Sequence, residues 1–331
     1  MRAWVLGLAL LACACARASS GQTNTIEEQW RAIEVTATPL DLGAERVGRL
    51  VFRGGLVLTA ETGWFGGFSG IDVLDGDRFL MISDRADWFE GRLLLDESGT
   101  LVGVDDVRMA GIRDESGEPY DERNDSDSEA LTQLPDGRFA VSFEQRPRVM
   151  IYDVNRDGPF GAATAGPPLA GVAALPPNAS LEALAVDAAG NLIVGAEGGG
   201  GTTPIWIAAL GATAPIESQH AYRLGLGYSL TAMDRGPDGG LYAIERFYAP
   251  VIGARARVMF IPDAAFESEG GVISGEELAL LAHPIAVDNF EGVSAVRRPD
   301  GGTRLYVISD DNFSPRQRTI LYAFDVESTP R

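Results

Sequence analysis

The segment Ser128-Glu129-Ala130-Leu131 leads through a turn at Asp136-Gly137 and an apolar run to Glu144, and this pattern recurs five times along the chain. The apolar run of each copy ends at an acidic residue, and successive copies lie 49 to 60 residues apart. The copies begin at Phe68, Ser128, Leu181, Leu230 and Phe290, and their acids are Asp84, Glu144, Glu197, Glu245 and Asp310. A short-strand unit that repeats at this period is the signature of a β-propeller.

Each copy predicts one blade, because an apolar strand, a turn with Gly and a second strand form a β-hairpin. A third strand follows each hairpin, for example at residues 149–152, and outer fourth strands are expected at 101–104, 221–224 and 278–282. The last copy lacks a fourth strand, which residues 49–52 and 56–59 are placed to supply. We therefore predict an all-β fold, a five-bladed propeller closed by an N-terminal strand. A sixth blade built partly from residues 30–60 is the alternative.

The hairpins also predict where the chemistry lies. In an antiparallel hairpin the start of the first strand lies beside the end of the second, so Glu129 should approach Glu144 and Glu182 should approach Glu197. Glu291 should likewise approach Asp310, and Ser69 should approach Asp84. Radially arranged blades would bring these pairs to one rim of the central channel. We take Glu129, Glu182, Glu291 and Asp310 as candidate catalytic residues; the alternative is that they are solvated turn residues.

Two acidic patterns on this rim indicate a divalent cation. Asp125-Ser126-Asp127-Ser128-Glu129 places acids at alternate positions, which suits a hard cation such as calcium. Asp288-Asn289-Phe290-Glu291 and Asp310-Asp311-Asn312 are the densest acidic clusters, and the hairpin between them should bring them together. The candidate ligands for Ca²⁺ are therefore Asp127, Glu129, Asp288, Glu291, Asp310 and Asp311.

Arginines accompany the same rim. Arg85, Arg146 and Arg246 follow hairpin-end acids by one or two residues, and Arg318 follows Asp310. A guanidinium group binds phosphate or carboxylate in a bidentate manner, so these four residues are candidate ligands for a small anionic or phosphorylated substrate. The alternative is charge balance, in which each arginine pairs with a neighbouring acid.

The composition excludes several function classes. The formal net charge of −20 argues against nucleic acid as a partner. The chain contains no lysine, so Schiff-base chemistry and Walker-type phosphate loops are excluded. It has two histidines, His220 and His283, and neither lies in a repeat, so neither a Ser-His-acid triad nor a zinc site is supported.

Residues 1–18 read as an export signal, with an apolar segment at 3–12 that is too short to span a bilayer. Leu10-Leu11-Ala12-Cys13 resembles a lipobox that would leave a lipid anchor on Cys13, whereas Ala16-Arg17-Ala18 would allow ordinary cleavage. We expect an exported bacterial protein, either periplasmic or anchored in the outer membrane. It should be a monomer without a transmembrane span, with an N-terminal extension at 19–48 and the propeller at 49–331.

Several of these motifs occur together in one known family. Phe65-Gly66-Gly67-Phe68-Ser69-Gly70, Ser83-Asp84-Arg85, Ser142-Phe143-Glu144 and Ile308-Ser309-Asp310-Asp311-Asn312-Phe313 resemble the bacterial family called phytase-like, or "esterase-like activity of phytase". The resemblance covers roughly residues 50–326. It implies a propeller rich in acidic residues and a phosphoesterase activity. Propeller phytases proper hold phosphate with calcium and basic residues that often include lysines, and this chain departs from them in having none.

The resulting functional expectation is a calcium-assisted phosphoester hydrolase. Two alternatives remain open: a calcium-dependent lactonase, with Glu182 or Glu291 as a metal ligand, and a non-catalytic propeller that binds a ligand or an envelope protein. Propellers serve all three purposes, so the fold alone does not choose among them.

Overall fold

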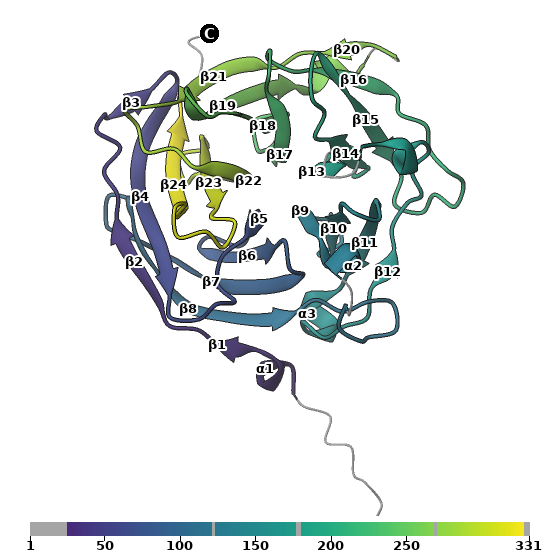
Figure 1. The fold of residues 1–331 in the computed structure, drawn as a ribbon, viewed down its shortest axis with the longest axis horizontal. Coiled ribbons are helices and arrows are strands. Elements are labelled where there is room, and N and C mark those ends of the chain that lie inside the picture. The colour runs from purple at the N-terminus through teal and green to yellow at the C-terminus, as the bar shows by residue number, and fades with distance from the viewer. Residues whose placement is uncertain (1–24, 121–122, 177–179, 268–269, 328–331) are drawn as a thin grey trace, which may run out of the picture.

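The computed structural model describes residues 25–120, 123–176, 180–267 and 270–327, and the expected export signal with Cys13 lies outside these ranges. The described part of the chain folds into five mainly antiparallel sheets arranged as blades around a central channel (Figure 1). The innermost strands pack side by side in a closed ring. The prediction of five blades is confirmed, and the alternative of a sixth is not.

Each blade begins at the channel and proceeds outward in chain order. The innermost strands are β5 (Phe68–Val73), β9 (Ser128–Gln133), β13 (Leu181–Val186), β17 (Ser229–Gly236) and β22 (Asn289–Arg297). The second strands are β6 (Arg78–Ser83), β10 (Phe139–Phe143), β14 (Leu192–Ala196), β18 (Gly240–Ala249) and β23 (Thr303–Asp310). The third strands are β7 (Asp87–Leu95), β11 (Arg148–Tyr152), β15 (Thr202–Ala208), β19 (Gly253–Pro262) and β24 (Thr319–Val326). The fourth strands are β8 (Leu101–Gly111), β12 (Thr164–Ala165), β16 (His220–Arg223), β21 (Glu276–Leu281) and β4 (Leu50–Ala60).

The N-terminal segment closes the ring, as the sequence predicts. β4 pairs antiparallel with β24 and becomes the fourth strand of the blade formed by the C-terminal part of the chain. Such closure covers a sheet edge that would otherwise be exposed. Short strands continue this outer layer: β2 (Val35–Pro39) and β3 (Arg46–Val47) pair with β4, while β1 (Arg31–Ala32) pairs with β8.

A cluster of charged residues around buried Asp325 stabilises the pairing that closes the ring. The carboxylate of Asp325 on β24 accepts hydrogen bonds from Arg304 Nε at 2.8 Å and Arg53 Nε at 2.5 Å, and Arg298 lies 3.1 Å away. Arg304 also donates to the carbonyl of Gly99 at 2.6 Å, in the first blade. The cluster therefore joins the last blade to β4 and to the first blade.

The remaining described elements are small. β20 (Val272–Ile273) pairs in parallel with β16, although it lies in the chain between β19 and β21, so it ties the third blade to the fourth. The helices are α1 (Ile26–Gln29), α2 (Arg123–Ser126) and α3 (Val154–Asp157), with 3₁₀ turns at Val172–Ala174 and Asp263–Phe266. In the described residues, no helix has the length and apolar character that crossing a membrane requires.

The hydrophobic core is divided into five clusters, each between two neighbouring blades. Because each sheet packs on both faces, the inner strands are buried nearly throughout, as the pattern of β13 shows. Between the first and last blades, Phe68 and Phe89 pack edge to face with ring centroids 4.9 Å apart. This packing holds the inner strand ends, and the side chains on them, in fixed positions.

One irregularity is repeated in every blade. At the start of each inner strand, the pairing with the second strand skips one residue, as in a β-bulge. The skipped residues are Ser69, Glu129, Glu182, Thr231 and Glu291. A bulge re-aims its side chain, so the repeat places five side chains at equivalent positions around one end of the channel. We call this set the bulge positions.

Candidate metal site at the mouth of the channel

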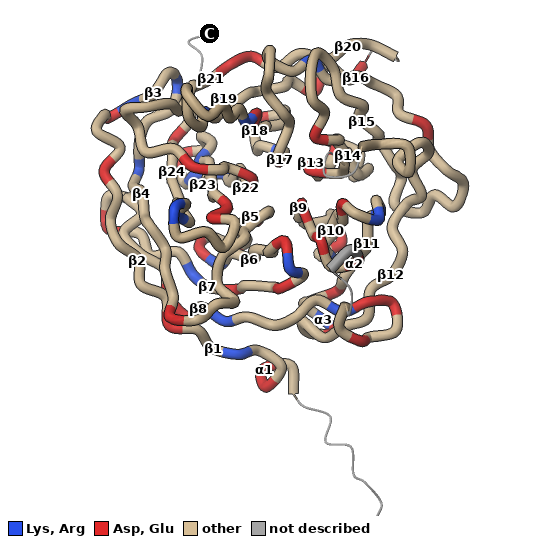
Figure 2. Tube along the Cα trace, viewed as in Figure 1, with Lys and Arg blue, Asp and Glu red and all other residues tan. Residues whose placement is uncertain are grey.

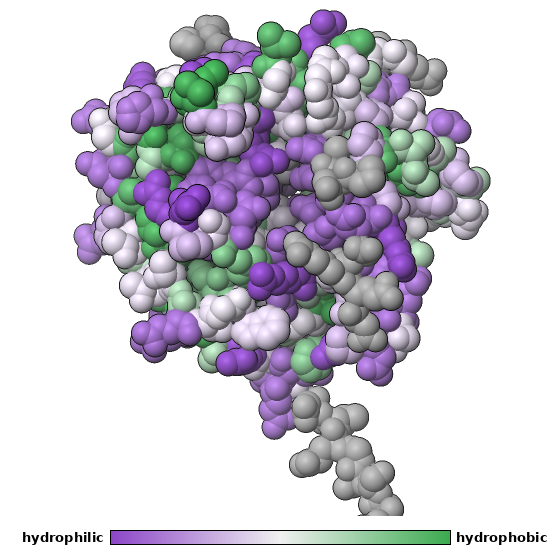
Figure 3. Space-filling view, viewed as in Figure 1, coloured by the Kyte–Doolittle hydropathy of each residue, from purple (hydrophilic) through white to green (hydrophobic). Residues whose placement is uncertain are grey.

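A cavity of about 850 Å³ opens at the end of the channel where the inner strands begin. Acidic residues gather around this opening (Figure 2), and hydrophilic side chains border the central hollow (Figure 3). The cavity is lined by nine carboxyl groups and two arginines among the described residues. The acids are Asp84, Asp127, Glu129, Glu144, Glu182, Glu197, Asp288, Glu291 and Asp310, and the arginines are Arg246 and Arg316.

A second ring of equivalent positions surrounds the bulge positions. In the first three blades the residue after the second strand donates its backbone N–H to the residue before the inner strand, for example Glu144 to the carbonyl of Asp127 at 2.9 Å. In the last two blades the same place is taken by Arg246, opposite Ser229, and Asp310, opposite Asn289. These hairpin-end positions are therefore Asp84, Glu144, Glu197, Arg246 and Asp310.

The expectation of an acid at all five hairpin ends is wrong for the fourth blade. Glu245 lies one residue too early in the register and is fully buried. It accepts hydrogen bonds from Tyr222 Oη at 2.8 Å and Gly225 N at 3.0 Å, and it pairs with Arg257 at 2.8 Å. A shift of one residue moves a side chain to the opposite face of a strand. Glu245 is therefore a structural acid, and the mouth receives Arg246 instead.

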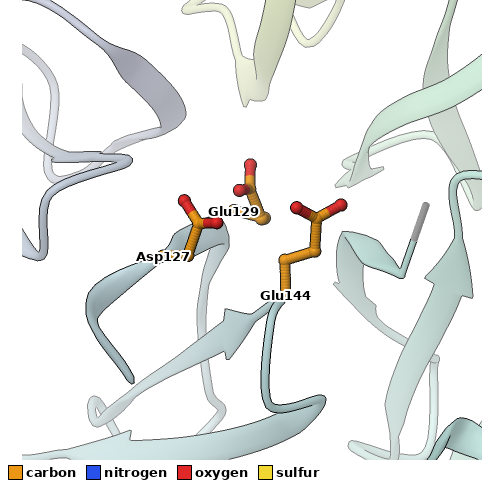
Figure 4. A group of neighbouring side chains, drawn as sticks. All are labelled: Asp127, Glu129 and Glu144. Atoms are coloured by element: carbon orange, nitrogen blue, oxygen red, sulfur yellow. The ribbon is translucent and has the colours of Figure 1, made fainter. Parts of the chain in front are cut away.

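Three acids of the second blade converge on one point. Each of Asp127, Glu129 and Glu144 offers a carboxylate oxygen, and these oxygens lie within 4.8 Å of one another. Figure 4 shows the side chains approaching from the start of β9 and the end of β10. Asp127 precedes the strand, Glu129 occupies the bulge and Glu144 occupies the hairpin end, so the local geometry of the blade creates the group.

This trio, which we call the carboxylate triad, suits a hard cation. Oxygen ligands of calcium lie 2.3–2.6 Å from the ion, so two ligands of one ion are at most about 5 Å apart. The separations in the carboxylate triad are within that limit. Glu129 and Glu144 are buried, and an ionised carboxylate is costly to bury without a positive partner. The residues present therefore fit a divalent cation held by carboxylate oxygens.

Burial and mutual repulsion raise the pKa of most acids in the mouth. The pKa of Glu129 is raised well above its ordinary value by burial and by the charges of Glu182, Glu291, Asp127 and Glu144. The pKa of Glu182 is raised for the same reasons, with Glu197 as its strongest acidic neighbour. A cation bound here would favour the ionised forms, because it supplies the missing positive charge.

The opposite side of the mouth holds a second pair of perturbed carboxyl groups. Burial raises the pKa of Glu291 to about 8, although Arg246 acts to lower it. Burial also raises the pKa of Asp310 to about 7, against the effect of the backbone N–H of Asn312. Both carboxyl groups therefore exchange protons near neutral pH, as acid–base catalysts must.

Arg246 is fixed by a network around Asn289. Arg246 Nη2 donates to Glu197 Oε1 at 3.2 Å, and its Nη1 donates to Asn289 Oδ1 and lies 3.6 Å from Glu291 Oε1. Asn289 Nδ2 in turn donates to Glu291 Oε1 at 2.7 Å and to Asp310 Oδ2 at 3.3 Å. Among the described residues, the buried Nε of Arg246 has no partner. That N–H is shielded from solvent, while the arginine as a whole lines the cavity.

Two of the predicted metal ligands have other contacts. Asp288 lines the cavity, but its carboxylate accepts hydrogen bonds from Gln317 Nε2 at 3.3 Å and Arg318 N at 3.0 Å. Asp311 lies outside the cavity lining and accepts from the backbone of Gly67, at 3.0 Å. The structure thus brings Asp127 and Glu129 together in the carboxylate triad and places Glu291 beside Asp310. It does not gather all six predicted ligands around one point.

The predicted arginines also separate. Arg246 enters the cavity, whereas Arg85 stacks on the ring of Phe313 with its Cζ 3.3 Å from the centroid. Arg146 is exposed and pairs with Asp125 at 2.8 Å, and Arg318 lies 3.9 Å from Asp288. Arg146 and Arg318 therefore have the contacts of the charge-balance alternative, whereas the stacking of Arg85 on an aromatic ring was not predicted.

Sequence reasoning left several cavity residues out of the candidate site, and three of them take part in the contacts described above. Glu144 and Glu197 were expected near Glu129 and Glu182, but neither was assigned a role. Their equal spacing of 15 residues from the bulge positions was the available signal. Asn289 is the third, and its link to Arg246 joins residues 43 positions apart, which no local pattern reveals.

Comparison with family models gives a match over most of the chain. A family model described as "Phytase-like: Esterase-like activity of phytase" matches residues 63–313. Comparison with curated protein sequences gave no match.

Several solved structures resemble the chain at low sequence identity. A candidate gluconolactonase has 14% identity and a TM-score of 0.46, with 91% of this chain and 94% of that chain covered. The PQQ-bound aldose sugar dehydrogenase of Streptomyces coelicolor has 13% identity and a TM-score of 0.43, covering 89% and 99%. The endo-arabinase of Bacteroides thetaiotaomicron has 11% identity and a TM-score of 0.46, covering 81% and 96%. Similarity at this level says nothing about chemistry.

Proposed function

The chain belongs to the phytase-like family, and from this premise we propose that it is a divalent-cation-dependent phosphoester hydrolase that acts at the mouth of the channel. The observation that carries the proposal is the carboxylate triad, which faces the same cavity as a partly buried arginine, Arg246. Together they offer a cation site and an anion-binding group within one enclosed space.

The carboxylate triad would hold the cation, and calcium is the proposed ion because every ligand in the set is a carboxylate oxygen. When bound, the cation supplies positive charge that polarises a phosphoryl oxygen. Glu182 lies beside this group, since its charge and that of Glu129 influence each other. We assign Glu182 a supporting role in which its carboxylate adds negative charge next to the cation.

Arg246 would bind an anionic oxygen of the substrate. Its guanidinium group is held by Glu197 and Asn289, so it does not have to be ordered when the substrate arrives. Because Arg246 lines the cavity, its guanidinium group is placed for a charge-assisted hydrogen bond to the ester. Fixed donors aimed at developing charge lower the barrier of such reactions.

Glu291 and Asp310 are the proposed acid–base pair. They are linked through Asn289 Nδ2, which donates to both carboxyl groups. With its pKa raised by burial to about 8, Glu291 holds a proton at neutral pH that it can donate to the leaving-group oxygen. Asp310 has its pKa raised by burial to about 7, so it is partly ionised at neutral pH and can accept a proton from water.

A lactonase is the second candidate, and it is favoured by the charge of the cavity. The mouth carries nine carboxyl groups against two arginines, which repels an anionic substrate unless cations are bound. A neutral lactone is not subject to this repulsion. The same acid–base pair could serve the hydrolysis of either ester.

The test is hydrolysis of phosphomonoesters, phosphodiesters and lactones, each with calcium and with a chelator. Glu129→Gln removes one member of the carboxylate triad, and Glu276→Gln is the matched control because Glu276 is exposed on an outer strand. Calcium-dependent phosphoester turnover that is lost only in Glu129→Gln supports the proposal. Turnover confined to lactones supports the second candidate. No turnover of any ester, with calcium still raising the melting temperature, would leave a non-catalytic binding propeller and overturn both.

A further inference from the structure

The hairpin of the fourth blade extends beyond the mouth. The pairing of β18 with β19 continues past Arg246 through Phe247, Tyr248 and Ala249. In the other blades the pairing of the second and third strands ends at or before the residue that precedes the hairpin end. At about 3.3 Å per residue, these three additional pairs carry the hairpin about 10 Å past the ring of acids.

This projection is apolar where it meets solvent. Val251 at its tip is 98% exposed, Tyr248 is 69% exposed and Ile252 is 52% exposed. The turn at residues 225–228 packs beside it, because the rings of Tyr228 and Phe247 lie 5.4 Å apart, and Leu226 on that turn is 95% exposed. We call this surface the apolar lip: Leu226, Tyr228, Phe247, Tyr248, Val251 and Ile252.

The apolar lip is continuous with the cavity. Phe247 and Tyr248 line the cavity together with Ala254 and Val287, so one of its walls is apolar, in contrast to the acidic residues around the rest of it. Arg246 stands at the base of that wall, next to Phe247. Isolated exposed apolar residues are normal, but a cluster beside a polar cavity marks a ligand-binding surface.

We propose that the substrate is an amphiphilic ester whose apolar alkyl or aryl group lies along the apolar lip. This inference rests on the proposed function for the polar end of the substrate, which would be held by Arg246 and the cation at the carboxylate triad. A highly phosphorylated polyol fits the mouth poorly, because it offers nothing to the apolar wall and two arginines line the described cavity. The apolar lip thus selects the alkyl or aryl part of the substrate, which departs with the leaving-group oxygen. The mouth selects the polar part of the ester, which is attacked.

The test measures binding, so that it does not depend on turnover. Alkylphosphonates from ethyl to octyl keep the anionic head and an alkyl tail, and their P–C bond is not an ester. Titration calorimetry in calcium should show Kd falling by about fourfold for each added methylene, as burial of apolar surface predicts. In Val251→Ser/Ile252→Ser this dependence should flatten, while the Kd of ethylphosphonate stays unchanged.

Val272→Ser is the matched control, since Val272 is 51% exposed on β20, outside the apolar lip. The altered residues of the test variant are exposed at a hairpin tip, and an unchanged melting temperature would verify that it folds. Three results would each overturn the inference. They are equal Kd values for ethyl and octyl phosphonates, an unchanged dependence of Kd on chain length in the double variant, and no binding at any chain length. Binding that depends on chain length, without hydrolysis of the matching alkyl phosphates, would overturn the hydrolase proposal and leave the apolar lip in place.

Discussion

Glu129→Gln should abolish the stabilisation of this protein by calcium while leaving the cation-free protein almost unchanged. The carboxylate oxygens of the carboxylate triad lie within 4.8 Å of one another. At an effective dielectric constant of 20, two like charges at that distance repel by about 3.5 kcal/mol. The cation-free protein avoids this repulsion by keeping protons, because burial and its acidic neighbours raise the pKa of Glu129 well above its ordinary value. The amide of glutamine has nearly the shape of a carboxylic acid and, like it, carries no charge, so the variant also avoids this repulsion.

The expected size of the calcium effect follows from mass action. A ligand at 100 times its Kd stabilises the folded state by about 2.7 kcal/mol. In a chain of 331 residues this corresponds to a rise in melting temperature of about 4 °C. In Glu129→Gln the rise should fall below about 1 °C, because the amide offers no negative charge to the cation. The melting temperature of the cation-free variant should stay within about 2 °C of that of the wild type.

Scanning calorimetry with calcium or with a chelator measures both quantities. The matched control is Glu245→Gln, since Glu245 is an equally buried acid of the fourth blade that binds Tyr222 and Arg257. That change should lower the melting temperature in both conditions and preserve the rise with calcium. The reasoning is refuted if Glu129→Gln keeps the full rise with calcium, or if it destabilises the cation-free protein as much as Glu245→Gln does.

Three further changes test other parts of the structure. Asp325→Asn should lower the free energy of unfolding by about 3 kcal/mol, measured by urea denaturation, because it leaves buried Arg304 without its charged partner. Burial raises the pKa of Asp72 from its ordinary value to about 6. Between about pH 4 and pH 6 the folded state therefore binds more protons than the unfolded chain, and stability falls as pH rises. Asp72→Asn should make that fall less steep in urea midpoints measured from pH 4 to pH 7. If the protein hydrolyses an ester at the mouth, Arg246→Lys should lower kcat/KM by about 100-fold, since lysine keeps the charge but loses the planar set of N–H donors. Unchanged kinetics would remove Arg246 from the proposed site.

The blades could be predicted from the sequence because each repeat carries its own hydrophobic hairpin, and such a signal is local. The mouth was only partly predictable, because its membership depends on register. Arg246 lies 15 residues after Thr231, the same spacing that separates Glu129 from Glu144, whereas Glu245 lies 14 residues after it. Glu245 was predicted as the hairpin-end acid, with Arg246 as its neighbour on the same rim, whereas the constant spacing selects Arg246 alone, since one residue reverses the face.

Long-range backbone contacts limited the remaining predictions. Asp311 stands in the densest acidic cluster of the sequence, which suggests a ligand, yet its carboxylate accepts a hydrogen bond from the backbone N–H of Gly67, 244 positions away. A carboxylate that accepts a hydrogen bond from a backbone N–H and one that binds a cation can have the same local sequence. Only the folded chain distinguishes them, because the partner comes from another blade.

The departures from the repeat explain how a nearly symmetric ring can hold an asymmetric substrate. Five identical blades would give five equivalent acids and no preferred orientation. The second blade has acids at its bulge and hairpin-end positions, and Asp127 beside them completes the carboxylate triad. The fourth blade has Thr231 and Arg246 at the same two positions, and its longer hairpin carries the apolar lip. The third blade separates these two blades, so the cation-binding side and the apolar side lie across the mouth from each other (Figure 1). A substrate with one charged end and one apolar end therefore has a single favourable direction in this cavity, and that direction brings its ester between Arg246 and the carboxylate triad.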